Sequence, residues 1–300
     1  MKDWIRKGTE ELRVRQHGET VVLSWKALEK LPFVRQCFST RQGGVSEGFL
    51  ATMNFSFDRG DDPDHVRENY RRIAETIGVP ADSFVVAHQT HTTNILAVGK
   101  EDRGTGVLRP RPYDDIDGLM TNAPGVTLVT YHADCIPVWL VDPSGKAAAL
   151  LHAGWKGTVD GVAPKAAGMM RELYGTKPED LIACAGPGIC SSCYEIGEDV
   201  AKRFREVFTA EELKEILTDY HEKEDGGHWQ LDLCQANRVL LLRSGVKPHN
   251  IHVSDICTRC NAERLFSHRA HGVRRGLNAA FLGIFPEEED SSPAEINLSR

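Results

Sequence analysis

Three side chains in this sequence could together hold a metal ion. His91, Cys135 and His152 offer imidazole nitrogens and a thiolate, which are donors that zinc and copper accept. Cys135 follows His91 by 44 residues, and His152 follows Cys135 by 17. This spacing excludes a local zinc finger and requires distant strands to converge. Two His and one Cys leave a fourth zinc position open for water or substrate, so the set predicts a catalytic metal.

Each of these three residues occurs where an apolar run meets a loop. His91 follows Gln89 in a polar break, Cys135 follows Asp134 at the start of an apolar run, and His152 precedes a glycine-bounded turn. We expect Gln89 to help to orient the ligands. Spacing alone leaves a second interpretation open, because a single His or Cys is more often a packed or hydrogen-bonded residue than a ligand.

Two cations and one carboxylate are candidates for the rest of the chemistry. Arg41 lies in a polar, glycine-bearing loop at 39–48 whose backbone N–H groups could face an anion, and its guanidinium could bind phosphate with two hydrogen bonds. A flexible hairpin loop is an equal alternative. Lys156 is the second candidate cation. Asp134 is the nearest group that could shuttle a proton, although a carboxylate beside a metal ligand can equally orient that ligand.

Composition limits the class of protein. The chain has 300 residues, of which 41% are hydrophobic and 26% charged, with a formal net charge of -7. It offers no basic surface for nucleic acid or an anionic membrane. Because no apolar stretch reaches the length of a signal peptide or a membrane span, we expect a cytoplasmic enzyme that acts on a small molecule.

Local patterns predict alternating helices and strands. Asp62 as a cap, Pro63 in the first turn and Gly78 as a stop define a helix between them. A further helix is expected over Thr158–Tyr174. Strands are expected at 20–25, 34–39, 181–189, 251–255 and 277–283, in two short runs within 84–98, and from Val126 onward. We expect one catalytic domain over residues 1–285 and an acidic, disordered tail at 286–300.

Several longer motifs resemble those of one family. They are Phe38–Ser46, Met53–Phe55, Gly60–Pro63, Gln89–His91, Asp117–Thr121, Ala133–Val138, His152–Gly157, Gly186–Ile189, Cys193–Gly197 and Ser267–Arg269. On these residues the chain resembles the YfiH-like family, known also as polyphenol oxidoreductase (laccase) proteins and as purine nucleoside phosphorylases. The run at 267–276 departs from the family's usual closing Arg-Arg-Asp-Gly stretch.

The resemblance implies a fold and a site. The fold would be α+β, a mixed β-sheet sandwich flanked by helices in α/β/β/α layers. A metal would be held at the His91, Cys135 and His152 positions, and the substrate would be a purine nucleoside. For such a substrate we expect Arg41 and Lys156 to bind phosphate and Asn54 to be a further substrate contact. The metal would be zinc, with copper as the alternative. We expect a monomer or a homodimer.

The implied activity is purine nucleoside phosphorolysis. Adenosine and inosine, with guanosine and methylthioadenosine as further candidates, would give free base and ribose 1-phosphate, and adenosine deamination could accompany this reaction. Two alternatives come from other classes: a copper-dependent polyphenol oxidase, against which the scattered His residues argue, and a non-catalytic module stabilised by a metal.

Two Cys-x-x-Cys pairs form a competing set of metal ligands. Four thiolates at Cys190, Cys193, Cys257 and Cys260 could make a closed structural zinc site. Cys193 and Cys257 match positions in the family, whereas Cys190 and Cys260 look like additions. Free thiols are therefore the interpretation that the sequence favours.

Overall fold

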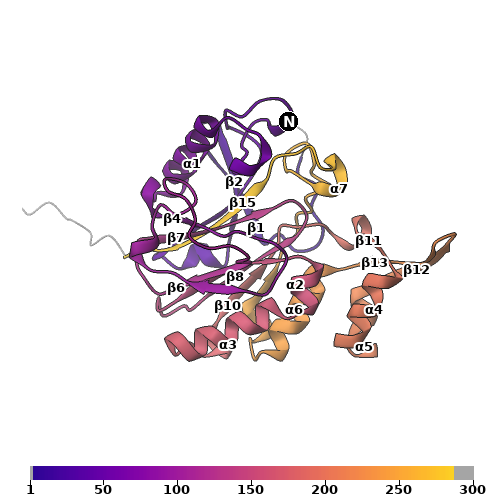
Figure 1. The fold of residues 1–300 in the computed structure, drawn as a ribbon. Coiled ribbons are helices and arrows are strands. Elements are labelled where there is room, and N and C mark those ends of the chain that lie inside the picture. The colour runs from indigo at the N-terminus through magenta and orange to yellow at the C-terminus, as the bar shows by residue number, and fades with distance from the viewer. Residues whose placement is uncertain (1–2, 287–300) are drawn as a thin grey trace, which may run out of the picture.

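A computed structural model describes residues 3–286. Two six-stranded sheets dominate it (Figure 1). The first has the order β1-β2-β3-β15-β7-β4 and the second β14-β10-β8-β9-β6-β5. Each is mixed, with one or two parallel pairs among antiparallel ones. The predicted acidic tail lies, apart from Pro286, outside the described residues.

The strands of the first sheet are β1 (Leu12–His17), β2 (Thr20–Trp25), β3 (Val34–Ser39), β4 (Phe84–Val86), β7 (Val126–His132) and β15 (Asn278–Ile284). Those of the second are β5 (Ile95–Ala97), β6 (Gly118–Thr121), β8 (Ile136–Val141), β9 (Ala148–Ala153), β10 (Ile182–Ala185) and β14 (Ile251–Val253). The helices are α1 (Pro63–Ile77), α2 (Trp155–Val159), α3 (Val162–Tyr174), α4 (Glu198–Val207), α5 (Ala210–Ile216), α6 (Leu233–Arg243) and α7 (His268–His271).

The two sheets pack face to face over an apolar core. Trp25 of β2 and Trp139 of β8 meet there edge to face, with ring centroids 5.8 Å apart, and both are fully buried. Removing such large side chains from water contributes about 1.5–3 kcal/mol each. Helix α1 covers the outer face of the first sheet, and α3 and α6 cover the outer face of the second (Figure 1). The predicted sandwich in α/β/β/α layers is therefore confirmed.

Local signals set the bounds of α1. The Asp62 side chain accepts a hydrogen bond from the N–H of Asp64, and Pro63 follows in the first turn. Gly78 ends the helix at a φ of 68°, which costs glycine little. The face that carries Val66 and Ile73 is buried against the first sheet.

The prediction of one helix over Thr158–Tyr174 is wrong in its start and its continuity. Helix α2 begins earlier, at Trp155, and ends at Val159, and α3 begins only at Val162. Gly161 lies between them with a φ of 80°, outside the helical region. Because α2 begins at Trp155, Lys156 lies in its first turn and lines a cavity beside Cys135.

A small third sheet extends from one end of the sandwich. Its order is β11-β13-β12, with β11 (Glu195–Gly197), β12 (Leu217–Lys223) and β13 (Gly226–Leu231). Helices α4 and α5 lie beside it (Figure 1). The strand pattern had not predicted this sheet. Within residues 3–286, none of the helices is both long and apolar enough to cross a bilayer.

The chain crosses between the two large sheets next to the predicted ligands. The connection from β4 to β5 carries His91, and that from β7 to β8 carries Cys135. Strand β9 pairs with β8 in the second sheet, so His152 lies opposite Pro137, two residues after Cys135. The sandwich therefore brings residues that are far apart in sequence to one place.

Candidate metal centre

The donor atoms of His91, Cys135 and His152 lie within 4.8 Å of one another. The Cys135 Sγ is 3.8 Å from the His91 Nε2, and the two imidazole rings are 4.9 Å apart at their centroids. Ligands in a tetrahedral zinc site are about 3.3–3.8 Å apart, since zinc bonds to nitrogen and sulfur are about 2.0–2.3 Å long. The three side chains therefore fit one zinc or copper ion.

Backbone geometry keeps this cluster compact. A Cβ on Gly154 would lie 2.9 Å from the His91 Cδ2 and 3.1 Å from the Cys135 Sγ, so a larger residue there would displace the ligands. His91 itself adopts a φ of 67°, and Asp134 a φ of 93°. Such conformations are uncommon for residues with a Cβ and are characteristic of functional sites.

Asp117 links two of the three ligands, and the sequence had given it no role beyond a family motif. Its fully buried carboxylate lies 2.7 Å from the His152 Nδ1 and accepts the backbone N–H groups of Thr90, His91 and Thr92 at 2.8–3.1 Å. Binding the Nδ1 leaves the Nε2 of His152 as its free donor atom. Asp117 thus fixes the His152 ring and the loop that carries His91.

Charge separation prepares these ligands before any metal binds. Burial opposes the charged forms of Cys135 and His152, but their mutual attraction outweighs it and lowers the pKa of Cys135 to about 6. The same attraction, with the bond from Asp117, raises the pKa of His152 to about 9. For Asp117, burial is outweighed by His152 and the backbone N–H groups, so its pKa falls to about 2. Cys135 is therefore a thiolate at neutral pH, as a metal ligand must be.

Asp134, the predicted proton shuttle, lines a cavity at the centre but is strongly bonded. One carboxylate oxygen accepts from the Thr258 hydroxyl at 2.6 Å and the other from the backbone N–H of Arg269 at 2.7 Å. Its backbone carbonyl accepts from the N–H of Ile189 at 2.9 Å. This geometry favours the orienting alternative, because the carboxylate ties two loops to the strand that ends at the metal ligands.

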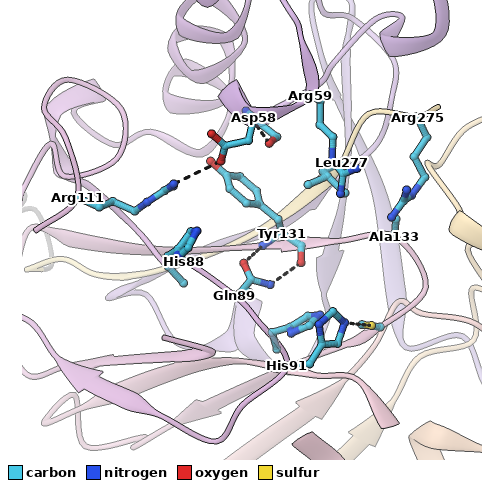
Figure 2. A pocket seen from close by; sticks show the side chains of 14 residues that line it. Asp58, Arg59, His88, Gln89, His91, Arg111, Tyr131, Ala133, Arg275 and Leu277 are labelled. Carbon is cyan, nitrogen blue, oxygen red and sulfur yellow. Dashed lines mark hydrogen bonds and ion pairs between the residues drawn. The ribbon is translucent and has the colours of Figure 1, made fainter. Parts of the chain in front are cut away.

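Gln89 acts on the backbone rather than on a ligand side chain. Its amide donates to the carbonyl of Tyr131 and accepts from the N–H of Tyr131, both at 2.7 Å (Figure 2). These two hydrogen bonds attach the loop that carries His91 to strand β7. The predicted orienting role is thus indirect.

Arg41 and Asn54 are committed to the scaffold. The Arg41 guanidinium donates to the carbonyls of Ala51 and Ala262 at 2.8 and 3.4 Å and stacks on Phe266. The fully buried Asn54 binds the Asp61 carboxylate and the backbone of Leu277. Neither residue lines the cavities beside Cys135. Both hold the loops around the centre, so the geometry does not support substrate contacts for them.

Two cavities meet at the candidate ligands. The first, of 260 Å³, is rich in arginine: Arg59 and Arg275 point into it on one side, and Arg111 approaches from the other, paired with Asp58 (Figure 2). The second, of 500 Å³, has aromatic walls at Trp155 and Tyr194. Residues shared by both are His91, Ala133, Cys135 and Arg275. Lys156, predicted as a cation for phosphate, lines the aromatic cavity and not the arginine-rich one.

Arg275 is the cation that sequence reasoning missed most clearly. It is only 9% exposed, and its Nε has no hydrogen-bond partner among the described residues, although its Nη1 donates to the carbonyl of Gly272. Burial and the nearby Arg59 both lower its pKa. A buried guanidinium with an unpaired Nε–H group has a donor available for an anion. The signal was present in the Arg-Arg-Gly run at 274–276, which had been read only as a departure from the family pattern.

The fold and the candidate centre define a class: a two-sheet sandwich with three potential metal ligands at the sheet crossings. The chain belongs to the family described as multi-copper polyphenol oxidoreductase laccase, whose model matches residues 35–285. It is 37% identical over 262 residues to a purine nucleoside phosphorylase of Deinococcus radiodurans, covering 87% of this chain and 93% of the relative. It is 31% identical over 265 residues to adenosine deaminase RL5 of an unknown prokaryotic organism, covering 86% and 98%.

A solved structure shares the fold. The crystal structure of YlmD from Geobacillus stearothermophilus superposes with a TM-score of 0.83 at 31% identity, covering 93% of this chain and all of YlmD. The family description mentions several coppers. Among the described residues, however, the metal-type side chains gather in two groups, one of His91, Cys135 and His152 and one of four cysteines. Neither is a multi-histidine copper cluster.

Proposed function

We propose that this protein is a zinc-dependent purine nucleoside phosphorylase that cleaves adenosine and inosine into free base and ribose 1-phosphate. The observation that carries the proposal is the junction of an arginine-rich cavity and an aromatic cavity at Cys135. Phosphorolysis needs an anion site on one side of the sugar and a stacking surface for the base on the other. Relatives named purine nucleoside phosphorylase support the same assignment.

Phosphate would bind in the arginine-rich cavity. Arg275 supplies a buried guanidinium whose Nε has no hydrogen-bond partner among the described residues. Arg59 adds positive charge from the same side of the cavity, and Arg111 from the other side. A guanidinium can bind two phosphate oxygens with parallel hydrogen bonds, which orients the anion as well as attracting it. Holding phosphate and nucleoside together in a fixed orientation removes much of the entropic barrier to their reaction.

The purine would lie in the aromatic cavity, between the faces of Trp155 and Tyr194. In the reaction, a phosphate oxygen forms a bond to the anomeric carbon of the ribose while the bond from that carbon to the base nitrogen breaks. The electron pair of that bond goes to the base, which then takes up a proton. Burial raises the pKa of Tyr194, so its hydroxyl stays protonated and can donate a hydrogen bond to the departing base.

His91, Cys135 and His152 would hold the zinc ion. With three protein ligands and an open position, zinc supplies Lewis-acid polarisation of a substrate oxygen or lowers the pKa of a bound water to about 7. The chain's own contribution is the ligand geometry held by Asp117, together with the loops that Asp134 ties beside the site. The thiolate and imidazole donors suit zinc and also copper. We propose a cytoplasmic setting, since all eight cysteines are free.

Adenosine deamination is the second candidate function, because a relative at 31% identity is named an adenosine deaminase. Deamination replaces the amino group of the base with an oxygen from water and needs no phosphate. The two reactions can therefore be distinguished by their products and by whether they require phosphate.

The test is a panel of nucleosides incubated with and without phosphate, with the products identified by mass. We expect free base and ribose 1-phosphate only when phosphate is present, and inosine from adenosine in either buffer. Arg59→Ala should raise the KM for phosphate while leaving deamination near the wild-type rate, because Arg59 lines only the arginine-rich cavity. Free base formed equally fast without phosphate would contradict phosphorolysis and indicate hydrolysis.

A further inference from the structure

We propose that Cys190, Cys193, Cys257 and Cys260 bind a second zinc ion that serves structure. Their four sulfurs lie within 4.8 Å of one another. Cys193 and Cys260 are 3.5 Å apart at sulfur, and Cys190 and Cys260 are 3.9 Å apart. A tetrahedral Zn(Cys)4 site requires about 3.8 Å between sulfurs, since the zinc–sulfur bond is about 2.3 Å. A disulfide would require about 2.05 Å, and all four thiols are free.

The sheet explains why the two pairs meet. Strands β10 and β14 are parallel neighbours, with Ala185 opposite Val253. Their carboxyl ends therefore emerge at the same edge, and Cys190 and Cys257 follow those ends by five and four residues. An isolated bridge between Gly188 and Cys257 continues the pairing beyond the strands. The sulfurs of Cys193 and Cys260, 67 residues apart in sequence, are thereby brought within 3.5 Å of each other.

The local spacing is that of a structural zinc site, and backbone N–H groups point at one of the four sulfurs. Each pair encloses two residues, the spacing common in structural zinc sites, and the N–H of Cys193 bonds the carbonyl of Cys190 at 3.0 Å to close a tight turn. The N–H groups of Cys190 and Cys260 both donate to the Cys257 Sγ, at 3.2 and 3.4 Å. Hydrogen bonds from N–H groups favour the charged thiolate over the thiol.

A nearby cation offsets the charge. Four thiolates and one Zn²⁺ carry a net charge of -2, and the Lys7 Nζ lies 3.1 Å from the Cys190 Sγ. Lys7 also binds Ser192 between the paired cysteines. The N-terminal segment is thereby drawn onto the cluster, where the backbone of Ile5 exchanges two hydrogen bonds with the Asn261 side chain.

The ligand set selects the metal. Four sulfurs in a compact tetrahedron suit zinc or a single iron, whereas calcium and magnesium prefer oxygen. Clusters of several irons hold their thiolates farther apart than these sulfurs lie. With four protein ligands no position is left for substrate, so the ion would cross-link two loops rather than take part in chemistry.

The cross-linked loops form one wall of the candidate active site. The loop after β10 carries Ile189 and Tyr194, which line the aromatic cavity. The loop after β14 carries Thr258, whose hydroxyl binds Asp134. A zinc ion at the four cysteines would therefore hold that wall in place. This inference stands independently of the proposed reaction, because it concerns metal content and not turnover.

Cobalt(II) is the probe that separates the two sites. Cys135→Ala removes a ligand from the first centre, so metal-free Cys135→Ala protein under reducing conditions should bind about one cobalt per chain at the four cysteines. Four thiolates give much stronger sulfur-to-cobalt absorption than one thiolate and two imidazoles. Added zinc should displace the cobalt and remove these bands. If Cys135→Ala protein binds no cobalt, or binds it without such bands, the proposal is wrong.

Zinc content provides the matched comparison. Wild-type protein should carry about two zinc ions per chain, and the double variant Cys190→Ser, Cys260→Ser about one. Cys234→Ser is the control, because Cys234 is a half-buried thiol outside both groups, and its zinc content should equal that of the wild type. An unchanged zinc content in the double variant would overturn the proposal.

If the double variant does not fold, an experiment on the wild-type protein tests the same proposal. Titration with an organomercurial should release zinc in step with the modification of four further thiols beyond those of Cys135 and the isolated cysteines, and a dye that chelates zinc would record the release. Four thiols that react without releasing zinc, or that are found as two disulfides in protein purified without reductant, would overturn the proposal.

Discussion

The two groups of metal-type side chains differ in the way they are built. His91, Cys135 and His152 come from a loop, a sheet crossing and a strand, and two cavities open onto them. The four cysteines come from two loops at one sheet edge, and each loop supplies a pair. Mixed nitrogen and sulfur donors with one position free suit catalysis, whereas four sulfurs suit a fixed cross-link. The difference teaches that the number and origin of the donor atoms distinguish a group suited to catalysis from one suited to structure.

The side chains and backbone groups around the two sets of donor atoms also differ. The first group is oriented by the buried carboxylate of Asp117 and faces Arg275. The second group receives backbone N–H groups and the Lys7 ammonium. A carboxylate behind a histidine tunes a ligand that must hold a reactive ion, while N–H groups and a lysine only balance thiolate charge. Substitutions at five positions test this contrast.

Cys135→Ala should have the largest effect. Losing the thiolate removes the metal that supplies several kcal/mol of transition-state stabilisation, so turnover should fall by a factor on the order of 10³ or more. The second group should keep its zinc, and the variant should fall from about two zinc ions to about one. Metal analysis and steady-state kinetics on the same preparation measure both quantities. Full turnover in zinc-depleted Cys135→Ala protein would show that a metal at this group is not needed for catalysis.

Arg275→Ala should come next. A charge-assisted contact contributes about 1.5–3 kcal/mol, so the apparent affinity for phosphate should fall about 10- to 150-fold. Arg275→Lys should recover only part of it, since an ammonium cannot make the paired hydrogen bonds.

Arg41→Lys is the matched control for Arg275. The Arg41 guanidinium is bonded to backbone carbonyls, so this substitution should lower the free energy of unfolding and leave the phosphate affinity unchanged. The KM for phosphate and urea unfolding measure the two effects. A loss of phosphate affinity in Arg41→Lys but not in Arg275→Ala would restore the loop at 39–48 as the anion site.

Asp117→Asn should weaken zinc binding at the first centre by about 10- to 100-fold, the usual cost of losing a carboxylate behind a histidine ligand. Competition with a chelator measures this affinity, and the second group should be unaffected. Equal weakening at both groups would indicate a general loss of structure and not an orienting role for Asp117.

The same variant has a pH signature in metal-free protein. The pKa of Asp117 is lowered on folding, so its carboxylate contributes stability that is present above the unfolded pKa, near 3.9, and is lost as the pH falls toward 2. The difference in unfolding free energy between wild type and Asp117→Asn should therefore shrink over that range. A difference that does not change with pH would contradict the charged role of Asp117.

Lys7→Ala should have the smallest effect. Lys7 is exposed, and such charge pairs contribute about 0.2–1 kcal/mol. The zinc content should stay at the wild-type value, while a chelator should extract zinc from the four cysteines about 1.4- to 5-fold faster. Extraction from the first group serves as the internal reference. An extraction rate that is unchanged at the four cysteines would show that the N–H groups alone balance the cluster.

The sequence by itself determined the local elements and singled out the most distinctive candidate ligands. Asp62, Pro63 and Gly78 marked both ends of α1, because caps and glycine stops act within a few residues. Apolar runs predicted the central strands, because this signal too is contained in a few consecutive residues. The ligands His91, Cys135 and His152 could be proposed because few residue types bind zinc and because they stand in specific motifs.

Only the tertiary structure decided which polar residues face the cavities. Arg41 and Asn54 look like binding residues in sequence, but the fold uses their donors to hold loops. Arg275 and Asp117 gain their positions through strands and loops that meet only after folding. The four cysteines converge because β10 and β14 are parallel neighbours. Burial of apolar surface sets these long-range pairings, and no local pattern records where a distant side chain will then lie.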